Sequence, residues 1–160
     1  MVDLGCGDFT IGARLRPYCG NYIACDIVEP LIEWNKQRYK GLNVDFRVLD
    51  LSDGEIPSGD VLFVRQVLQH LSNSHIERAL AQLSVKFKYL IITEHLPTSG
   101  RFTHNLDKPA GASVRTGLNS GVVLTSPPFN LKVGEDIVLC ETPEGSGIIR
   151  TNVYVIPAPR

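Results

Sequence analysis

Apolar residues along the first 95 positions alternate between short runs and helical spacing. The short runs, which are typical of buried strands, occupy residues 2–4, 21–25, 44–49, 60–64 and 88–93. After residue 74 the apolar positions Ile76, Ala79, Leu80 and Leu83 recur at helical spacing behind Ser74-x-x-Glu77, a possible capping box. Two further helices are predicted, one ending near Pro17 and Gly20 and one running from about Pro30 to Tyr39. This alternation predicts an α/β fold with a doubly wound, mostly parallel sheet.

The pattern changes beyond residue 95. Residues 97–121 carry four glycines and two prolines without helical periodicity, which is typical of a lid or a binding loop. We interpret this segment as a substrate-facing lid that carries Arg101, His104, Lys108 and Arg115; a merely solvated loop is the alternative. Two further strands, at residues 136–141 and 148–156, are expected to form a terminal antiparallel hairpin and bring the sheet to seven strands.

Composition narrows the class of protein. The 160 residues suit one domain, residues 1–160. The 16 basic and 17 acidic residues are scattered and give a net charge of −1, which disfavours a nucleic-acid partner. No apolar run suits a membrane helix and no signal peptide is evident, so we expect a cytoplasmic protein. The four cysteines lack metal-ligand spacing, so no metal site is expected.

The first ten residues, MVDLGCGDFT, carry the main functional signal. A strand signal is followed by Gly5 and Gly7, and a helix can begin at Thr10. Glycines let a ligand approach the backbone, and a helix N-terminus presents free N–H groups. The sequence therefore predicts a nucleotide cradle, with a glycine turn that binds no ligand as the alternative.

The spacing of the acidic residue and the glycines bears on which nucleotide is bound. A nicotinamide fingerprint requires a third glycine where Thr10 stands, so an NAD(P)-dependent oxidoreductase is a weaker alternative. Asp3-x-Gly5-x-Gly7 instead resembles motif I of the class I S-adenosylmethionine-dependent methyltransferases, a Rossmann-like family. That family usually has a further glycine at the position of Phe9.

Two more carboxylates follow in the expected order. Asp26 ends the second strand about 20 residues beyond the glycines, where a carboxylate can accept hydrogen bonds from both ribose hydroxyls; a helix cap is the alternative. The resemblance implies that Asp50 accepts from the adenine amino group and that the N–H of Leu51 meets a ring nitrogen, against the alternative of a polar turn. It also makes Asp3, Gly5, Cys6, Gly7, Ile27 and Arg65 candidate cofactor-binding residues, with S-adenosylmethionine as the cofactor.

Methyl transfer depends mainly on alignment of donor and acceptor, although a histidine can help as a base. His70 lies in a V-L-x-H-L-type segment after the fourth strand, as the family often has, and His95 follows the fifth. A packing role is the alternative for each. Arg115 and Lys108 are the candidates to hold an anionic acceptor, and arginine is the better shaped of the two for a carboxylate or phosphate.

We therefore expect a methyltransferase with a small-molecule acceptor; the alternative is a non-catalytic, regulatory domain that binds S-adenosylmethionine. In the family a helical segment precedes the first strand and covers part of the cofactor. This sequence has none, so we expect a truncated start, a mis-assigned start or an unusually open cleft. The oligomeric state is left open.

Overall fold

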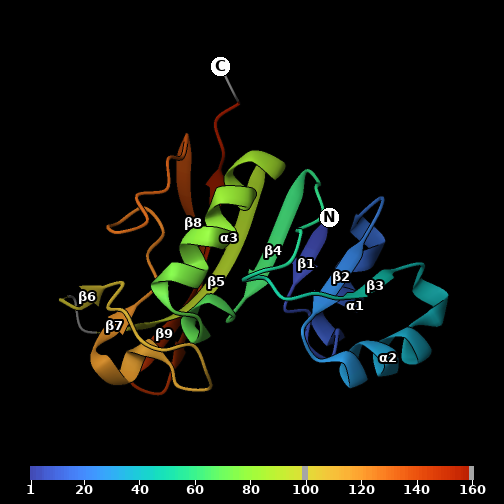
Figure 1. The fold of residues 1–160 in the computed structure, drawn as a ribbon, viewed down its shortest axis with the longest axis horizontal. Helices are drawn as coiled ribbons and strands as arrows, with labels where there is room; N and C mark the ends of the chain where they lie inside the picture. Colours follow the sequence, from blue (N-terminus) through green and yellow to red (C-terminus); the bar gives the residue numbers. More distant parts are fainter. Residues whose placement is uncertain (99–100, 159–160) are drawn as a thin grey trace.

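A seven-stranded sheet forms the centre of the molecule (Figure 1). The computed structural model describes residues 1–98 and 101–158. The strand order is β3-β2-β1-β4-β5-β9-β8, in which β1 to β5 pair in parallel and β9 and β8 are antiparallel. The bounds are β1 (Val2–Leu4), β2 (Ile23–Asp26), β3 (Asp45–Val48), β4 (Val61–Arg65), β5 (Tyr89–Pro97), β8 (Glu135–Glu144) and β9 (Gly147–Val155). This arrangement confirms the predicted fold class, including its terminal hairpin.

Helices cover both faces of the sheet. On one face α1 (Thr10–Leu15) and α2 (Glu29–Arg38) enclose a cluster that includes Phe9, Tyr22 and Phe46. On the other face α3 (Asn73–Lys86) packs its buried side onto the larger core, which includes Leu4, Leu62 and Leu90. Short 3₁₀ helices occupy η1 (Arg16–Tyr18), η2 (Lys40–Leu42), η3 (Leu68–His70) and η4 (Arg115–Leu118). Among the described residues, no helix combines the length and the apolar character needed to cross a membrane.

Phe9, which stands where the resemblance leads one to expect glycine, keeps a left-handed backbone with φ of 58°. Its side chain is fully buried and lies edge-on to the rings of Tyr22, Tyr39 and Phe46, with centroid separations of 4.9–5.3 Å. A positive φ is unfavourable for phenylalanine, and the packing of its ring against three other aromatic rings offsets this cost. The turn after β1 therefore keeps its shape without the third glycine.

Residues 101–121 contain buried polar side chains, among them Asn105, Lys108 and Arg115, which differs from a merely solvated loop. They contain β6 (Thr103–His104) and β7 (Ser120–Gly121), which pair in parallel, as well as η4. Asn105 is buried, and its side chain bonds the backbone of Val123, Ser126 and Pro127. Residues 99–100 of the predicted lid lie outside the described residues. Buried polar contacts hold this segment in place, and a pattern of apolar positions cannot predict such contacts.

Two boundaries also differ from the sequence prediction. The helix α3 is capped by Ser72, whose Oγ accepts from the N–H of His75 at 3.4 Å, so Ser74 is not the N-cap. The strand β5 continues to Pro97, so Glu94 and His95 lie within it. The strand was underestimated because these polar residues interrupt its apolar run.

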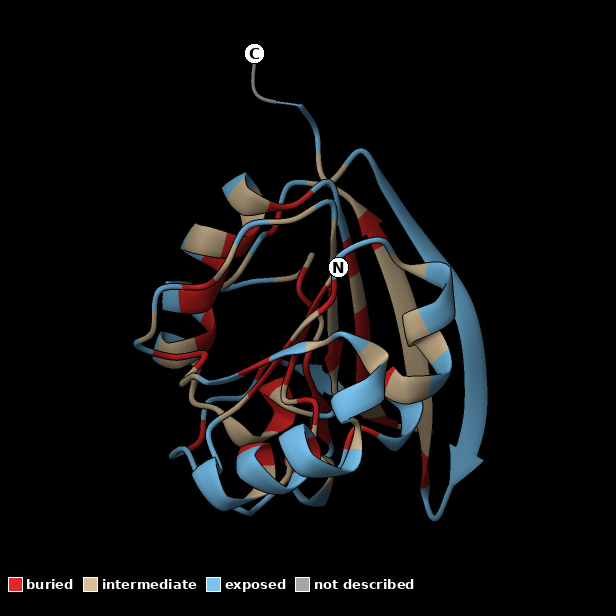
Figure 2. Cartoon of the chain, turned by 90° about the vertical axis from the view of Figure 1, so that its right-hand side faces the viewer, coloured by how far each residue is buried: buried red, intermediate tan, exposed pale blue. Residues whose placement is uncertain are grey.

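The far edge of the sheet is open. Every residue of β8 is exposed, and Figure 2 shows this long strand in pale blue along its whole length. Its partner β9 is mostly half-buried. The well-covered part of the sheet is therefore the part that contains β1, β2 and β4, where the predicted nucleotide site lies.

Candidate cofactor and acceptor site

A cleft of about 350 Å³ opens at the carboxyl ends of the parallel strands β1 to β4. It brings together seven of the predicted site residues. Its lining consists of Gly5, Asp26, Ile27, Leu49, Asp50, Leu51, Arg65, Gln66, Val67, His70 and Leu71. A larger hollow of about 470 Å³ lies between α3 and residues 129–132. The cleft at the strand ends is the better candidate site, since open α/β sheets place ligands there and the larger hollow has none of the predicted site residues.

The glycine turn is fixed by two neighbouring elements, β2 and α2. The N–H groups of Gly5 and Cys6 donate to the carbonyl of Cys25 at 2.8 and 2.9 Å. Asn35 of α2 is fully buried and donates from Nδ2 to the carbonyl of Gly7 at 2.7 Å. Gly7 has a φ of 56°, and a Cβ there would meet no atom within 4 Å, so the turn leaves open space for a ligand.

The helix N-terminus contributes less than expected. The helix α1 has six residues, and Asp8 accepts from both the N–H and the Oγ of Thr10, at 3.0 and 2.9 Å. These bonds hold the pKa of the Asp8 carboxyl below its usual value. An anionic group already occupies this end of the helix, so the cradle depends on the turn and the carboxylates.

Both carboxylate oxygens of Asp26 accept hydrogen bonds from the backbone. Its Oδ1 accepts from the N–H of Val28 at 3.0 Å, next to the start of α2, and its Oδ2 accepts from the N–H of Gly7 at 3.0 Å. Each carboxylate oxygen can accept a further hydrogen bond. The side chain is half-buried and lines the cleft, so both oxygens are aligned by protein donors and can still bind hydroxyl groups.

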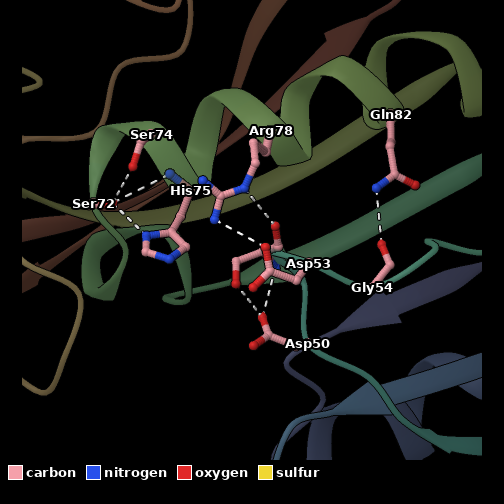
Figure 3. A network of polar contacts seen from close by, with 9 residues as sticks. Asp50, Asp53, Gly54, Ser72, Ser74, His75, Arg78 and Gln82 are labelled. Atoms are coloured by element: carbon pink, nitrogen blue, oxygen red, sulfur yellow. Dashed lines mark hydrogen bonds and ion pairs between the residues drawn. The ribbon is translucent and has the colours of Figure 1, made fainter.

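Asp50 lies in a polar turn that α3 holds in place. Its Oδ1 accepts from the Oγ and the N–H of Ser52 at 2.6 and 2.7 Å, and the Oγ bond is the main reason that its pKa is lowered. Figure 3 shows Arg78 and Gln82 reaching from α3 to this loop. Arg78 donates to the carbonyl of Ser52 and to Asp53, and Gln82 donates to the carbonyl of Gly54 at 3.0 Å. The carboxylate is therefore positioned from two sides.

Asp3 and Cys6 lie beneath the glycine turn and do not line the cleft. Both are almost fully buried. Asp3 accepts from the hydroxyl of Tyr22 at 2.9 Å, its Oδ1 has no partner in the described part of the chain, and burial raises its pKa to about 6. Burial also raises the pKa of the Cys6 thiol. Their positions suit support of the turn better than direct contact with a ligand through the side chain.

Arg65 presents a cation to the cleft. Its guanidinium carbon lies 5.3 Å from the ring centroid of Phe63. Its Nε is buried and has no hydrogen-bond partner among residues 1–98 and 101–158. An unpaired buried donor is costly unless a ligand satisfies it, so Arg65 can receive an anionic group.

His70 is the histidine that the structure brings to the cleft. It ends η3, and its Nδ1 is buried without a partner in the described chain. Just before it, Val67 lies against the glycine turn, because a Cβ at Gly5 would be 2.2 Å from the Cγ2 of Val67. Only a residue without a side chain lets η3 approach the turn this closely.

His95 and Arg115 do not lie where the sequence suggested. The imidazole of His95 contacts the β8–β9 turn, with its Nε2 3.2 Å from the carbonyl of Glu144, and it does not line the cleft. Arg115 is 1% exposed and hydrogen-bonds to protein acceptors near η3. Neither side chain lines the cleft. Alternation along the longer β5 explains the position of His95, and the burial of the Arg115 side chain explains that of Arg115.

Among the residues that support the site, sequence reasoning missed the roles of Asn35 and Gln82. Each is a polar residue within a helix whose side chain bonds a turn of the cleft. A polar residue at a buried helical position was the available signal for Asn35. Gln82 offered none, since its partners Gly54 and Ile56 lie in a loop whose position beside α3 the sequence pattern does not show.

The fold and the cleft define a Rossmann-like nucleotide-binding α/β protein, and comparisons with known proteins narrow the class. A family model described as a methyltransferase domain matches residues 1–87, more than half of the chain. The chain belongs to this methyltransferase family, and its cofactor is S-adenosylmethionine. No curated protein sequence matches it.

Solved structures support the same fold. The N-terminal domain of EvdMO1 with SAH bound has a TM-score of 0.69 at 15% identity, over 98% of this chain and 74% of that one. A TehB-like SAM-dependent methyltransferase from Corynebacterium glutamicum has a TM-score of 0.62 at 21% identity, over 98% and 79%. The mitomycin 7-O-methyltransferase MmcR has a TM-score of 0.62 at 14% identity, over 96% and 48%. Some matched proteins are much longer, and the chain spans 44% of one from Bacillus subtilis.

Proposed function

We propose that this protein transfers a methyl group from S-adenosylmethionine to a small-molecule acceptor. The observation that carries the proposal is the single cleft in which Gly5, Asp26, Asp50, Arg65 and His70 meet. One comparison supports a small acceptor, since one of the similar structures is a mitomycin 7-O-methyltransferase.

The residues of the cleft fit the parts of the cofactor. Asp26 suits the ribose hydroxyls because both of its oxygens are aligned and have acceptor capacity left. Asp50 keeps its Oδ2 without a partner in the described chain and suits the adenine amino group, with the N–H of Leu51 beside it. The unpaired Nε of Arg65 suits the carboxylate of the methionyl part.

When bound, S-adenosylmethionine supplies a methyl group already activated by its sulfonium. The protein then has to align and desolvate, and alignment of this kind contributes about 7–11 kcal/mol to lowering a barrier. His70 lies at the same cleft and can accept a proton from a hydroxyl or ammonium acceptor, which would add roughly 100- to 10,000-fold.

The cofactor assignment is tested by titrating S-adenosylhomocysteine into the protein in a calorimeter. Asp26→Ala is expected to raise the Kd by at least about tenfold, because two charge-assisted hydrogen bonds are lost. Asp45→Ala is the matched control, since Asp45 is the first residue of β3 and lies at the end of that strand away from the cleft. Unchanged affinity for Asp26→Ala would remove Asp26 from the ribose role.

Turnover separates catalysis from binding alone. Release of S-adenosylhomocysteine in the presence of a panel of hydroxyl and amine acceptors is expected for the wild type and is expected to fall at least about 100-fold in His70→Ala. The second candidate is a domain that binds S-adenosylmethionine without turnover. It is favoured by the finding that all five N–H groups of Arg115 are bonded to protein acceptors, which leaves this residue no donor for an acceptor molecule. Tight cofactor binding with no turnover of any acceptor would support it.

A further inference from the structure

The backbone carbonyls of four consecutive residues, 68 to 71, all accept hydrogen bonds from one distant segment. Arg115 donates from Nη1 to the carbonyls of Leu68 and Gln69, at 3.1 and 3.3 Å, and from Nη2 to that of Leu71 at 2.7 Å. The carbonyl of His70 accepts from the N–H of Gly111 at 2.9 Å and from the Nζ of Lys108 at 3.3 Å. Residues 108–115 thus hold every carbonyl of η3 and of the residue that follows it.

The guanidinium of Arg115 is saturated by the protein. Its remaining bonds run from Nε to the carbonyl of Leu106 at 3.0 Å and from Nη2 to the Oδ1 of Asn73 at 2.9 Å. These make five hydrogen bonds for the five N–H groups that an arginine carries. Arg115 therefore has no donor left for a substrate, and its planar fork matches several carbonyls at once in a way that lysine does not.

The other side of η3 is held by β5. Glu94 is buried and accepts at Oε1 from the N–H of Leu68 at 3.1 Å. Donors from residues 108–115 thus bond the carbonyl groups of η3, and an acceptor from β5 bonds an N–H group of the same short helix. The helix carries His70 into the cleft, and residues 66, 67 and 71 beside it also line the cleft.

We propose that Arg115 is a positioning residue, which fixes η3 and thereby sets where His70 and the adjoining wall of the cleft stand. Residues 108–115 act as a fixed clamp on the site and do not open as a lid. The catalytic meaning of the clamp rests on the proposed methyl transfer; the mechanical part does not.

The mechanical part is tested on the full chain without ligand, by hydrogen exchange. Arg115→Met is expected to raise exchange at the amides of residues 68–71 by at least about tenfold. Arg115→Lys keeps the charge but not the fork, so an intermediate increase is expected. Arg101→Met is the matched control, because Arg101 is exposed in the same segment; it is expected to leave these amides unchanged.

Lys108→Met provides a second, milder variant in case Arg115→Met does not fold. It removes one long bond to His70 while the N–H of Gly111 stays in place, so a smaller increase limited to residues 68–71 is expected. Unchanged exchange at these amides in folded Arg115→Met, or in folded Lys108→Met where the arginine variant does not fold, would overturn the clamp. So would an equal rise throughout the chain, which indicates a merely structural role.

Two spectroscopic and binding readouts connect the clamp to the site. In Arg115→Met the ¹⁵N shifts of the His70 ring are expected to move, and the Kd for S-adenosylhomocysteine is expected to rise about tenfold. If the wild type does not bind S-adenosylhomocysteine, the proposed function fails while the exchange result still decides the clamp. If the wild type binds but Arg115→Met changes neither the His70 shifts nor the Kd, the positioning role fails alone.

Discussion

Phe9 and Gly12 show how a single residue pair can replace a glycine of a binding motif. The ring of Phe9 fills the space above Gly12, where an added Cβ would lie 2.2 Å from Cε2 and 2.4 Å from Cδ2. Phe9 is surrounded by three aromatic rings, so its ring has little room to move. Phe9 stands where the family usually has glycine, and its ring in turn requires a glycine at position 12.

We therefore expect Gly12→Ala to destabilise the fold by about 1–3 kcal/mol through overpacking, despite the better helix propensity of alanine. Urea denaturation measures the change. Gly20→Ala is the control, since a Cβ there meets no atom within 4 Å. The double variant Phe9→Leu with Gly12→Ala is expected to lose less than the sum of the two single changes, because the smaller side chain relieves the clash. A Gly12→Ala variant as stable as the wild type would contradict this account.

At the scale of elements, α3 does more than cover the sheet. Along one side it carries Arg78, Gln82 and Lys86, which bond the connection between β3 and β4 at Ser52, Asp53, Gly54 and Ile56. That connection has no helix of its own in the structure, so these bonds fix the loop that carries Asp50 and Leu51 (Figure 3).

Gln82→Ala is expected to lower the free energy of unfolding by about 1–3 kcal/mol, because the partly buried N–H of Ile56 loses its acceptor. Amides of residues 50–56 are expected to exchange faster, and the Kd for S-adenosylhomocysteine to rise a few-fold. Glu77→Ala, an exposed change on the same helix, is the control. Faster exchange with unchanged cofactor affinity would mean that the order of this loop does not matter for binding.

The same elements show what a sequence can and cannot predict. Asp26 and Asp50 could be found because the strand pattern places both at one edge of the sheet. The burial of Arg115 could not be predicted, because a charged residue in a glycine-rich segment is usually exposed and its burial depends on carbonyls more than 40 positions away. Glu94 was misplaced for a related reason, since a buried carboxyl inside a strand breaks the apolar pattern by which strands are recognised.

At the scale of the whole molecule, that buried carboxyl links stability to pH. Burial raises the pKa of Glu94 from its ordinary 4.5 to about 8, against the N–H groups of Leu68 and Gln69 and the cation of Arg115, which lower it. Tyr154 also faces it. The folded protein thus holds a proton that the unfolded chain releases above about pH 4.5, so the protonated group stabilises the fold fully below that pH.

The stabilisation by protonated Glu94 is expected to be lost as the pH rises through about 8. Between about pH 4.5 and 8 the unfolding free energy falls with a slope that corresponds to at most one proton. Glu94→Gln removes the titration. From pH 5 to 8 the unfolding free energy of the wild type is therefore expected to fall relative to that of the variant. Urea denaturation across this range measures it, with Glu77→Gln as the exposed control. A constant difference across the range would show that Glu94 stays ionised in the folded protein.

The contact between Gly5 and Val67 joins the two walls of the cleft, one from the glycine turn and one from η3. If a cofactor on the first wall and an acceptor on the second both favour the same fit of this contact, their affinities are thermodynamically linked. Linkage is reciprocal, so the factor by which bound cofactor raises the affinity for the acceptor equals the factor by which bound acceptor raises the affinity for the cofactor. S-adenosylhomocysteine would occupy the same wall after transfer and would then hold the methylated product in place, which makes product release a natural limit on the turnover rate.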